Sequence, residues 1–166
     1  MKKQAWGQIH EICSQWKPDI LWYDGGWLAH HGTDADAAPF WDAIGLARMA
    51  RSYNPRVMMT PRSDYVGDFT CQEGPKPVTG PIVDHMWEKC FSLATSWGFI
   101  PGNTYKTGDF LIVSLINTAS RGGNLLLNVD PDVNGRIPDE EREALVEPGD
   151  WMRRNGHSIR GTRAGA

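Results

Sequence analysis

The strongest constraint on the fold is a short apolar run that ends in an acid. Residues 20–23 are large aliphatic and aromatic side chains, typical of a strand buried on both faces of a parallel sheet. Asp24 follows directly, and Gly25 and Gly26 let the backbone turn sharply after it. In (β/α) barrels and open α/β sheets, functional groups lie at the carboxyl ends of strands. The run predicts a functional carboxylate there, although Asp-Gly is also a common turn pair and Asp24 could be purely structural.

Helical and strand patterns alternate along the chain. Helical spacing or helix boundaries predict helices over 6–16, 39–53, 108–120 and from Asp139 onward, the last kinked or broken at Pro148-Gly149. Apolar runs predict strands over 20–23, 57–60, 85–90 and 125–129, with loops over 63–83 and 92–107. This alternation is typical of βα units around a parallel sheet. Because a closed (β/α)8 barrel needs eight strands and about 250 residues, we predict an α/β fold that is a partial TIM barrel.

Composition excludes several classes of function. The chain has 166 residues and a net charge of −3 with scattered Lys and Arg, so we expect no nucleic-acid partner. No stretch is long and apolar enough for a membrane span, and Met1-Lys2-Lys3 precedes the polar Gln4 rather than a signal core. We therefore expect no membrane partner and no export signal in this chain.

The cysteines and histidines do not predict a metal site. Cys13, Cys71 and Cys90 are odd in number and lack a C-x-x-C pair, so we expect reduced thiols, at least two of them buried. The segment with His30-His31, Asp34 and Asp36 is better interpreted as a solvated loop than as metal ligands. Eight tryptophans, several near acids or glycines, mildly favour a carbohydrate site, because aromatic faces stack on sugar rings.

Four acids stand where a barrel places functional groups: Asp24, Asp68, Glu73 and Glu88. Retaining glycosidases need two carboxyl groups about 5 to 5.5 Å apart, one as nucleophile and the other as acid and then base. The nucleophile must be ionised and benefits from hydrogen-bond donors, whereas the acid must hold its proton and benefits from apolar surroundings. The chain has enough carboxyl groups for this chemistry.

The order and spacing of the motifs support a resemblance to one family. The blocks are Trp22-Tyr23-Asp24-Gly25, Arg62, Gly67-Asp68-Phe69-Thr70-x-x-Glu73, Trp87-Glu88-x-Cys90, Ser96-Trp97-Gly98-Phe99, Gly122-Gly123-Asn124-Leu125-Leu126-Leu127-Asn128-Val129-x-Pro131, Gly135-x-Ile137-Pro138, Gly149-x-Trp151 and Asn155-Gly156-x-x-Ile159. Together they resemble the second half of the catalytic domain of α-L-fucosidases, the retaining enzymes of glycoside hydrolase family 29. The similarity extends from about Gln8 to Thr162.

The resemblance implies roles for individual residues. Asp24 matches the family's nucleophile, and Glu73 matches the general acid/base of bacterial relatives, with Glu88 as the rival. Arg62 and Trp97 match residues that contact the fucose, and we place Trp22 in the same substrate site. For Arg62 a structural role as a carboxylate brace is the alternative, and for Asp68 we expect such a bracing role.

The same resemblance implies an activity. It predicts hydrolysis of terminal α-L-fucose from glycans or glycoconjugates by double displacement, with a fucosylated oligosaccharide or glycoconjugate as partner and no cofactor or metal. The alternatives are a non-catalytic carbohydrate-binding fragment and a retaining glycosidase of other sugar specificity. Residues 1–162 are expected to form part of the barrel, and 163–166 a tail towards a β-sandwich. A secreted or periplasmic parent enzyme fits the resemblance, and the chain alone is expected to have little or no activity.

Three departures from the family pattern predict local instability. Asp130 stands where relatives usually have glycine, Asn134 replaces a common aspartate, and Pro148 falls within an expected helix. We expect these changes to affect stability more than chemistry.

Overall fold

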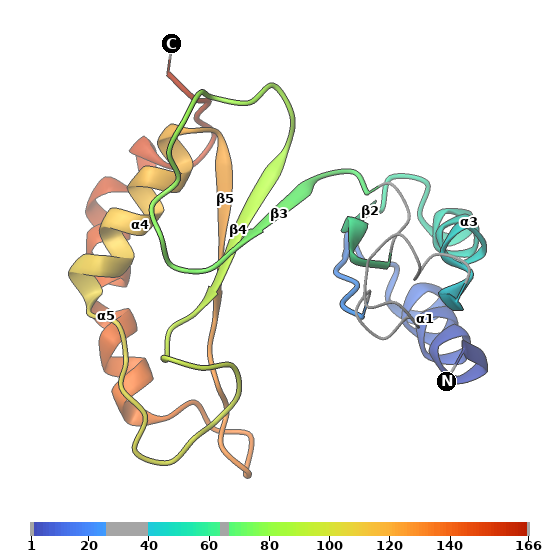
Figure 1. The fold of residues 1–166 in the computed structure, drawn as a ribbon, viewed down its shortest axis with the longest axis horizontal. Coiled ribbons are helices and arrows are strands. Elements are labelled where there is room, and N and C mark those ends of the chain that lie inside the picture. Colours follow the sequence, from blue (N-terminus) through green and yellow to red (C-terminus); the bar gives the residue numbers. More distant parts are fainter. Residues whose placement is uncertain (1, 26–39, 64–66, 166) are drawn as a thin grey trace. The chain divides into compact units, whose positions relative to one another are not determined.

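The structure is a computed structural model that describes residues 2–25, 40–63 and 67–165. The chain forms two compact units, Met1–Thr70 and Cys71–Ala166 (Figure 1). Each unit is an α/β arrangement that contains a parallel strand pair. This confirms the α/β class with parallel strands expected from the alternating pattern.

The first unit packs two helices beside a two-stranded parallel sheet. Its elements are α1 (Lys2–Trp16), β1 (Ile20–Leu21), α3 (Ala43–Tyr53), β2 (Met58–Met59) and the 3-10 helix η2 (Pro61–Ser63). Strands β1 and β2 pair in the register Ile20 with Met58 and Leu21 with Met59. The core contains Leu21 and Met59 from the sheet together with buried residues of both helices. The helices bury one face, as their apolar spacing predicts.

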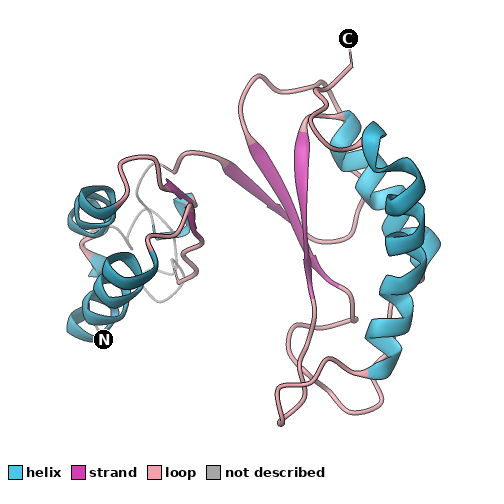
Figure 2. Cartoon of the chain, turned by 180° about the vertical axis from the view of Figure 1, so that it is seen from behind, coloured by secondary structure: helices cyan, strands magenta, loops and turns pink. Residues whose placement is uncertain are grey.

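The second unit places two helices against one face of a three-stranded sheet (Figure 2). Its elements are β3 (Thr70–Glu73, beginning at the unit boundary), β4 (Trp87–Ser92), α4 (Gly108–Ser120), β5 (Gly123–Asn128), α5 (Asp139–Asn155) and the 3-10 helix η3 (Gly156–Ser158). The sheet order is β3-β4-β5, and β4 runs parallel to β5 from Trp87 opposite Gly123 to Ser92 opposite Asn128. Phe91, Leu93 and Leu111 form the buried centre.

Two expectations about elements of the second unit are wrong. Residues 70–73 form a strand although we expected an irregular loop, because the short polar run Thr70–Glu73 has no apolar pattern of its own and pairs with the adjacent β4. Helix α5 continues through Pro148 to Asn155 and does not break there. A proline removes one backbone donor, and the helix packs against α4, which can outweigh that loss. Helix α4 has the expected bounds, and Thr107 caps it by accepting a hydrogen bond from the Phe110 amide.

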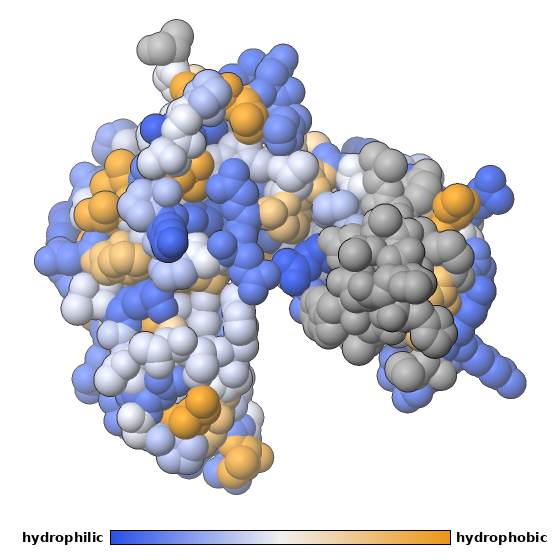
Figure 3. All heavy atoms as spheres, viewed as in Figure 1, coloured by the Kyte–Doolittle hydropathy of each residue, from blue (hydrophilic) through white to orange (hydrophobic). Residues whose placement is uncertain are grey.

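The visible face of the second unit carries several apolar patches (Figure 3). Figure 3 shows separate orange patches among hydrophilic atoms on the visible face of the second unit. Exposed apolar side chains include Val113 on α4 and Val133 after β5. Among the residues described, no helix has the length and apolar character needed to cross a membrane. Cys13 and Cys90 are buried, as expected for two of the three thiols.

Candidate functional site

Asp24 lies just beyond the carboxyl end of β1. Thr60, a buried residue after β2, holds Tyr23, the residue before Asp24, through two hydrogen bonds. The Tyr23 amide donates to Thr60 Oγ1 at 2.9 Å, and the Thr60 hydroxyl donates to the Tyr23 carbonyl at 3.0 Å. The Thr60 amide in turn donates to the carbonyl of Leu21 at 3.2 Å. The two strand ends are therefore joined by three hydrogen bonds, which place the Asp24 carboxylate at the edge where parallel α/β sheets carry function.

Arg62 comes to the same edge from the other strand. It lies in η2, directly after β2, and donates its Nε–H to Asp24 Oδ1 at 2.8 Å. Its guanidinium also lies over the Trp22 ring, 5.1 Å from the ring centroid. The Asp24 side chain keeps 43% of its surface exposed, so the ion pair leaves the carboxylate accessible. The structure brings together three of the predicted site residues: Asp24, Arg62 and Trp22.

A small cavity of about 160 Å³ lies beside this cluster. Tyr23, Asp24, Gly25, Trp41 and Arg62 contribute to its lining, together with residues of α1 and α3. Trp41 donates its indole N–H to the Gly25 carbonyl at 3.2 Å and so holds the turn after Asp24. Small-molecule pockets usually have volumes of about 300 to 1,000 Å³, so this cavity is smaller than a complete small-molecule site. Sequence reasoning missed Trp41, for which the abundance of tryptophan was the only signal.

The hydroxyl of Tyr23 is buried and has no hydrogen-bond partner among the described residues. Burial raises the pKa of Tyr23 to about 12, with the nearby Cys13 contributing in the same direction and Arg51 opposing. The neutral phenol therefore forms an uncharged wall of the cavity at physiological pH.

Asp68 has the bracing role expected for it. Its carboxylate accepts both the Met59 amide at 2.8 Å and the Arg51 guanidinium at 2.9 and 3.0 Å. The Asp68 amide donates to the Met59 carbonyl at 2.8 Å. These contacts tie the chain after residue 66 to β2 and α3, so Asp68 is committed to structure.

The second unit carries the remaining predicted site residues. Glu73 ends β3 with an exposed side chain, and Glu88 lies half-buried on the paired strand β4. The Cys71 thiol lies 3.8 Å from Glu88 Oε1. Trp97, in the loop after β4, has 50% of its surface exposed. The structure thus distributes the predicted residues over two units, with both glutamates and Trp97 in the second.

A buried polar cluster beneath the Trp97 loop was missed by sequence reasoning. Asp130, just after β5, accepts hydrogen bonds from the Gly98 amide at 3.0 Å, the Asn128 side chain at 2.7 Å and the Ser92 hydroxyl at 3.1 Å. Its own amide donates to Glu141 Oε2 at 2.9 Å. Asp130 is thus fully partnered, contrary to the local instability we expected from it, and it links β4, β5 and the Trp97 loop.

Lys106 closes the same cluster. Its ammonium donates to the carbonyls of Ser92 and Ala94, both at 2.6 Å, and lies over the Phe91 ring. Burial lowers the pKa of Lys106, while the charge of Asp130 acts in the opposite direction. Glu141 is fully buried, and burial raises its pKa. The only sequence signal for this cluster was an aspartate directly after the clearest strand.

Comparison with known proteins shows the family of this chain. The sequence profile described as Alpha-L-fucosidase matches residues 1–157. This chain belongs to the alpha-L-fucosidase family. Tissue alpha-L-fucosidase of Mus musculus is 29% identical over 165 residues, covering 92% of this chain and 34% of that protein. Plasma alpha-L-fucosidase of Rattus norvegicus is 30% identical over 158 residues, with the same coverage.

Solved fucosidase structures share the fold. Alpha-L-fucosidase isoenzyme 1 from Paenibacillus thiaminolyticus superposes with a TM-score of 0.86 at 31% identity, covering 99% of this chain and 42% of that one. The Thermotoga maritima alpha-fucosidase, solved in complex with fucose, gives a TM-score of 0.78 at 27% identity over 99% of this chain and 36% of that one. The chain thus spans about a third of the length of its curated fucosidase relatives.

The described part of the chain contains no group of three or more His, Cys, Asp or Glu side chains placed to hold a metal ion. The segment with His30, His31, Asp34 and Asp36 lies outside the described residues, as does Trp27.

Proposed function

We propose that this chain is the second half of the (β/α)8 barrel of a retaining α-L-fucosidase. Family membership and the superposition on fucosidase structures support the assignment. The domain limits of 1–162 for the barrel part and 163–166 for a tail belong to the same proposal. The observation that carries the function is the Asp24–Arg62 pair at the carboxyl ends of β1 and β2.

Asp24 is the proposed nucleophile. Its Oδ atom attacks the anomeric carbon of fucose, and the bond to the leaving oxygen breaks as that oxygen takes a proton from the acid. A fucosyl ester of Asp24 results. Water, deprotonated by the same acid/base residue, then attacks the anomeric carbon and releases Asp24. Exposure of the carboxylate and its ion pair with Arg62 support this role, because the pair orients the carboxylate while leaving it accessible to a substrate.

Glu73 is the proposed acid/base, with Glu88 as the rival. The exposed position of Glu73 at the end of β3 gives it access to a ligand. Glu88 lies within β4, where its carboxylate contacts the Cys71 thiol, which supports a structural role. Glu88 is nevertheless only half-buried, so both residues enter the test.

Fucose recognition is assigned to Arg62, Trp97 and Trp22. Arg62 offers a cation next to Asp24, and the exposed Trp97 offers an apolar face for the sugar. The relative from Thermotoga maritima was solved in complex with fucose, which supports fucosylated glycans or glycoconjugates as the substrate class. The chain alone is expected to turn over little, because its first-unit cavity holds only about 160 Å³.

The test supplies the amino-terminal half of the Paenibacillus thiaminolyticus relative to this chain and measures hydrolysis of an aryl α-L-fucoside. Asp24→Asn should abolish turnover, whereas Asp19→Asn, at an exposed aspartate before β1, should leave it unchanged. A 2-fluorofucosyl donor should label the peptide that contains Asp24 in mass spectrometry. Hydrolysis retained by Asp24→Asn would overturn the proposal.

The acid/base is identified by rescue. With an activated aryl fucoside, azide should restore turnover to the variant that lacks the acid/base, because azide attacks the fucosyl ester without needing a base. We expect rescue of Glu73→Gln and none of Glu88→Gln. Rescue of Glu88→Gln alone would transfer the role to Glu88. Fucose binding without any turnover would favour a carbohydrate-binding fragment.

A further inference from the structure

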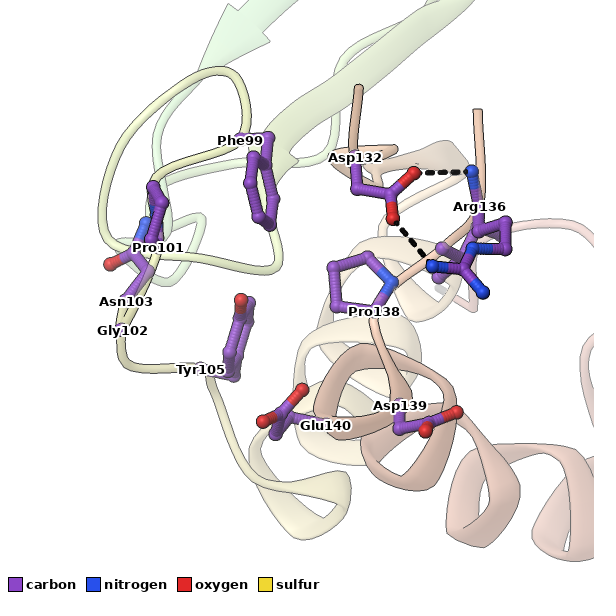
Figure 4. Close-up of a pocket in the computed structure, with 11 residues that line it drawn as sticks. Phe99, Pro101, Gly102, Asn103, Tyr105, Asp132, Arg136, Pro138, Asp139 and Glu140 are labelled. Atoms are coloured by element: carbon purple, nitrogen blue, oxygen red, sulfur yellow. Dashed lines mark hydrogen bonds and ion pairs between the residues drawn. The ribbon is translucent and has the colours of Figure 1, made fainter. Parts of the chain in front are cut away.

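The second unit contains a larger cavity that the proposed catalysis does not use. It has a volume of about 420 Å³ and lies between the loop after β4 and the loop after β5 (Figure 4). We call it the Phe99 pocket, and the residues that define it here are Phe99, Asn103, Tyr105, Asp132, Pro138 and Glu140. Both loops follow the carboxyl ends of parallel strands, the edge at which α/β proteins bind ligands. Its volume falls within the usual range of about 300 to 1,000 Å³ for small-molecule sites.

Aromatic and polar groups face each other across this pocket. Figure 4 shows the Phe99 and Tyr105 rings on one side and Pro138 with Asp132 on the other. Glu140 lies near Tyr105 at the start of α5. Aromatic faces stack on the C–H faces of sugar rings, and carboxylate and amide oxygens accept hydrogen bonds from sugar hydroxyls. This combination fits a polyhydroxylated ring.

The aromatic wall is held in place by its own loop. Ala94 and Tyr105 form an antiparallel bridge at the base of the loop. The Asn103 side chain donates to Ser96 Oγ at 3.1 Å, and the Gly98 amide, one residue before Phe99, donates to buried Asp130. These contacts fix the loop before any ligand arrives, so little ordering entropy opposes binding.

The opposite wall is equally fixed. The Asp132 amide donates to the Arg136 carbonyl at 2.8 Å, and Asp132 Oδ1 accepts the Arg136 and Asn134 amides at 2.9 and 2.8 Å. The Arg136 backbone hydrogen bond is the main cause that lowers the pKa of Asp132, so this carboxylate is ionised at neutral pH. A closed turn of this kind presents a preformed rim to a ligand.

Charge distinguishes between neutral and anionic ligands. The pocket contains the carboxylates of Asp132, Asp139 and Glu140, while its one lining cation, Arg136, pairs with Asp132. Asp139 pairs with Arg142 outside the pocket. Two of the three carboxylates are thus paired with arginines, and Glu140 gives the pocket a negative charge. This charge repels an anion and can accept a hydroxyl donor, so a neutral sugar is favoured over a sialylated one.

We propose that the Phe99 pocket binds the neutral pyranose next to fucose in the substrate, that is, a sugar of the leaving group. This rests on the proposed function, because Trp97, assigned there to fucose, stands two residues before Phe99 on the same loop. The turn at Gly98, with φ of +80°, lies between the two aromatic residues and allows each to serve a different sugar.

The test is a titration of the whole chain with lactose, a neutral disaccharide without fucose, followed by backbone NMR. We expect millimolar affinity and shifts confined to residues 97–105 and 132–140. Phe99→Ala should weaken binding about fivefold or more, in line with the contribution of an aromatic contact. The control Trp16→Ala removes an exposed aromatic residue of the first unit and should change nothing.

Three results would overturn the inference: no binding of lactose, unchanged affinity in Phe99→Ala, or equally tight binding of 3′-sialyllactose. If Phe99→Ala alters the spectrum of the whole second unit, Glu140→Ala provides the replacement, and it should weaken lactose binding. Asp24→Asn should leave this titration unchanged while abolishing hydrolysis, so failure of the pocket proposal and failure of the fucosidase proposal are measured separately.

Discussion

Arg62 donates its Nε–H to Oδ1 of Asp24 at 2.8 Å, while the same guanidinium lies over the ring of Trp22. The two charged residues are 38 positions apart in the chain and meet because β1 and β2 are parallel neighbours. The contact therefore depends on the sheet, and it makes Arg62 both a positioning group for Asp24 and a neighbour of any sugar bound there.

Replacing Arg62 by alanine should lower turnover strongly and the free energy of unfolding only slightly. The ion pair is partly exposed, so its loss should lower the free energy of unfolding by no more than ~1 kcal/mol. Turnover by the reconstituted fucosidase should fall roughly 10- to 100-fold, the equivalent of one charged hydrogen bond. Urea unfolding and aryl fucoside hydrolysis measure the two effects.

Arg48→Ala removes an exposed arginine of α3 and is the matched control. It should change neither the free energy of unfolding nor the turnover. Arg62→Lys keeps the charge but loses the flat face over Trp22, so it should restore activity only in part. A loss of several kcal/mol in Arg62→Ala would instead make Arg62 a brace of the fold.

The strand-end position of Asp24 was accessible from sequence because it depends on a local pattern, an apolar run followed by an acid and a glycine. Arg62 follows the next apolar run, but only the family resemblance marked it as a site residue. Trp41 was missed because its role is a single long-range hydrogen bond to the Gly25 carbonyl. No periodicity encodes such a contact.

The second unit was harder to predict from sequence because its structure depends on contacts between residues that lie far apart in the chain. Strand β3 is formed by the polar residues Thr70–Glu73, and its strand conformation depends on pairing with β4. Asp130 looked like a defect in sequence, whereas its three hydrogen-bond donors come from residues two, 32 and 38 positions away. Tertiary partners decide the role of a buried polar group.

Asp68→Ala should destabilise the first unit. The variant leaves the amide of Met59, a buried residue, without its acceptor and frees Arg51. A lost acceptor of this kind costs about 1 to 3 kcal/mol. Urea unfolding of the chain checks it, with Asp19→Ala as the control; equal midpoints for the two variants would contradict the bracing role.

Tyr23→Phe should stabilise the chain and make its free energy of unfolding depend less on pH under alkaline conditions. The hydroxyl has no partner among the described residues, and its removal relieves a penalty of roughly 1 kcal/mol. The pKa of Tyr23 is raised to about 12 from 10. Between these values the unfolded tyrosine ionises first, so wild-type stability falls as pH rises from about 10 to 12.

The measurement is the difference in unfolding free energy between wild type and Tyr23→Phe at several pH values. Lys and other Tyr residues titrate in both proteins and cancel in the difference. The stabilising effect of the variant should grow across this window. A difference that stays constant with pH would contradict a buried phenol.

Glu141→Gln should change the acid side of the stability profile. Burial raises the pKa of Glu141 above its ordinary value of 4.5, and one oxygen of its carboxyl group has no hydrogen-bond partner in the described structure. The protonated carboxyl of Glu141 contributes to the free energy of unfolding. This contribution is complete below pH 4.5 and is lost as pH rises through the raised pKa. The variant cannot ionise, so its stability relative to wild type should increase with pH over that interval.

Thermal unfolding from pH 4 to 8 checks this, with exposed Glu143→Gln on the same helix as the control. Parallel profiles for wild type and Glu141→Gln would mean that the carboxyl ionises normally in the fold.

Asp130→Ala should release the Trp97 loop without unfolding the second unit. The carboxylate accepts the Gly98 amide at 3.0 Å, and the alanine variant removes that acceptor. Hydrogen exchange of the Gly98 amide should accelerate at least tenfold, the loss of about 1.4 kcal/mol of protection that a single hydrogen bond supplies. The Leu111 amide, bonded to the Thr107 carbonyl within α4, is the internal reference and should exchange as before.

Asp130→Asn retains an oxygen that can accept the Gly98 amide, so it should restore slow exchange, while Asp84→Ala removes an exposed aspartate and should have no effect. If Gly98 exchanges equally fast in wild type and Asp130→Ala, Asp130 does not hold the loop. If loop release is seen, affinity for lactose should fall in the same variant although Asp130 does not line the Phe99 pocket. Such a loss without any removed contact is expected when preorganisation of Phe99, not an added hydrogen bond, supplies the binding free energy.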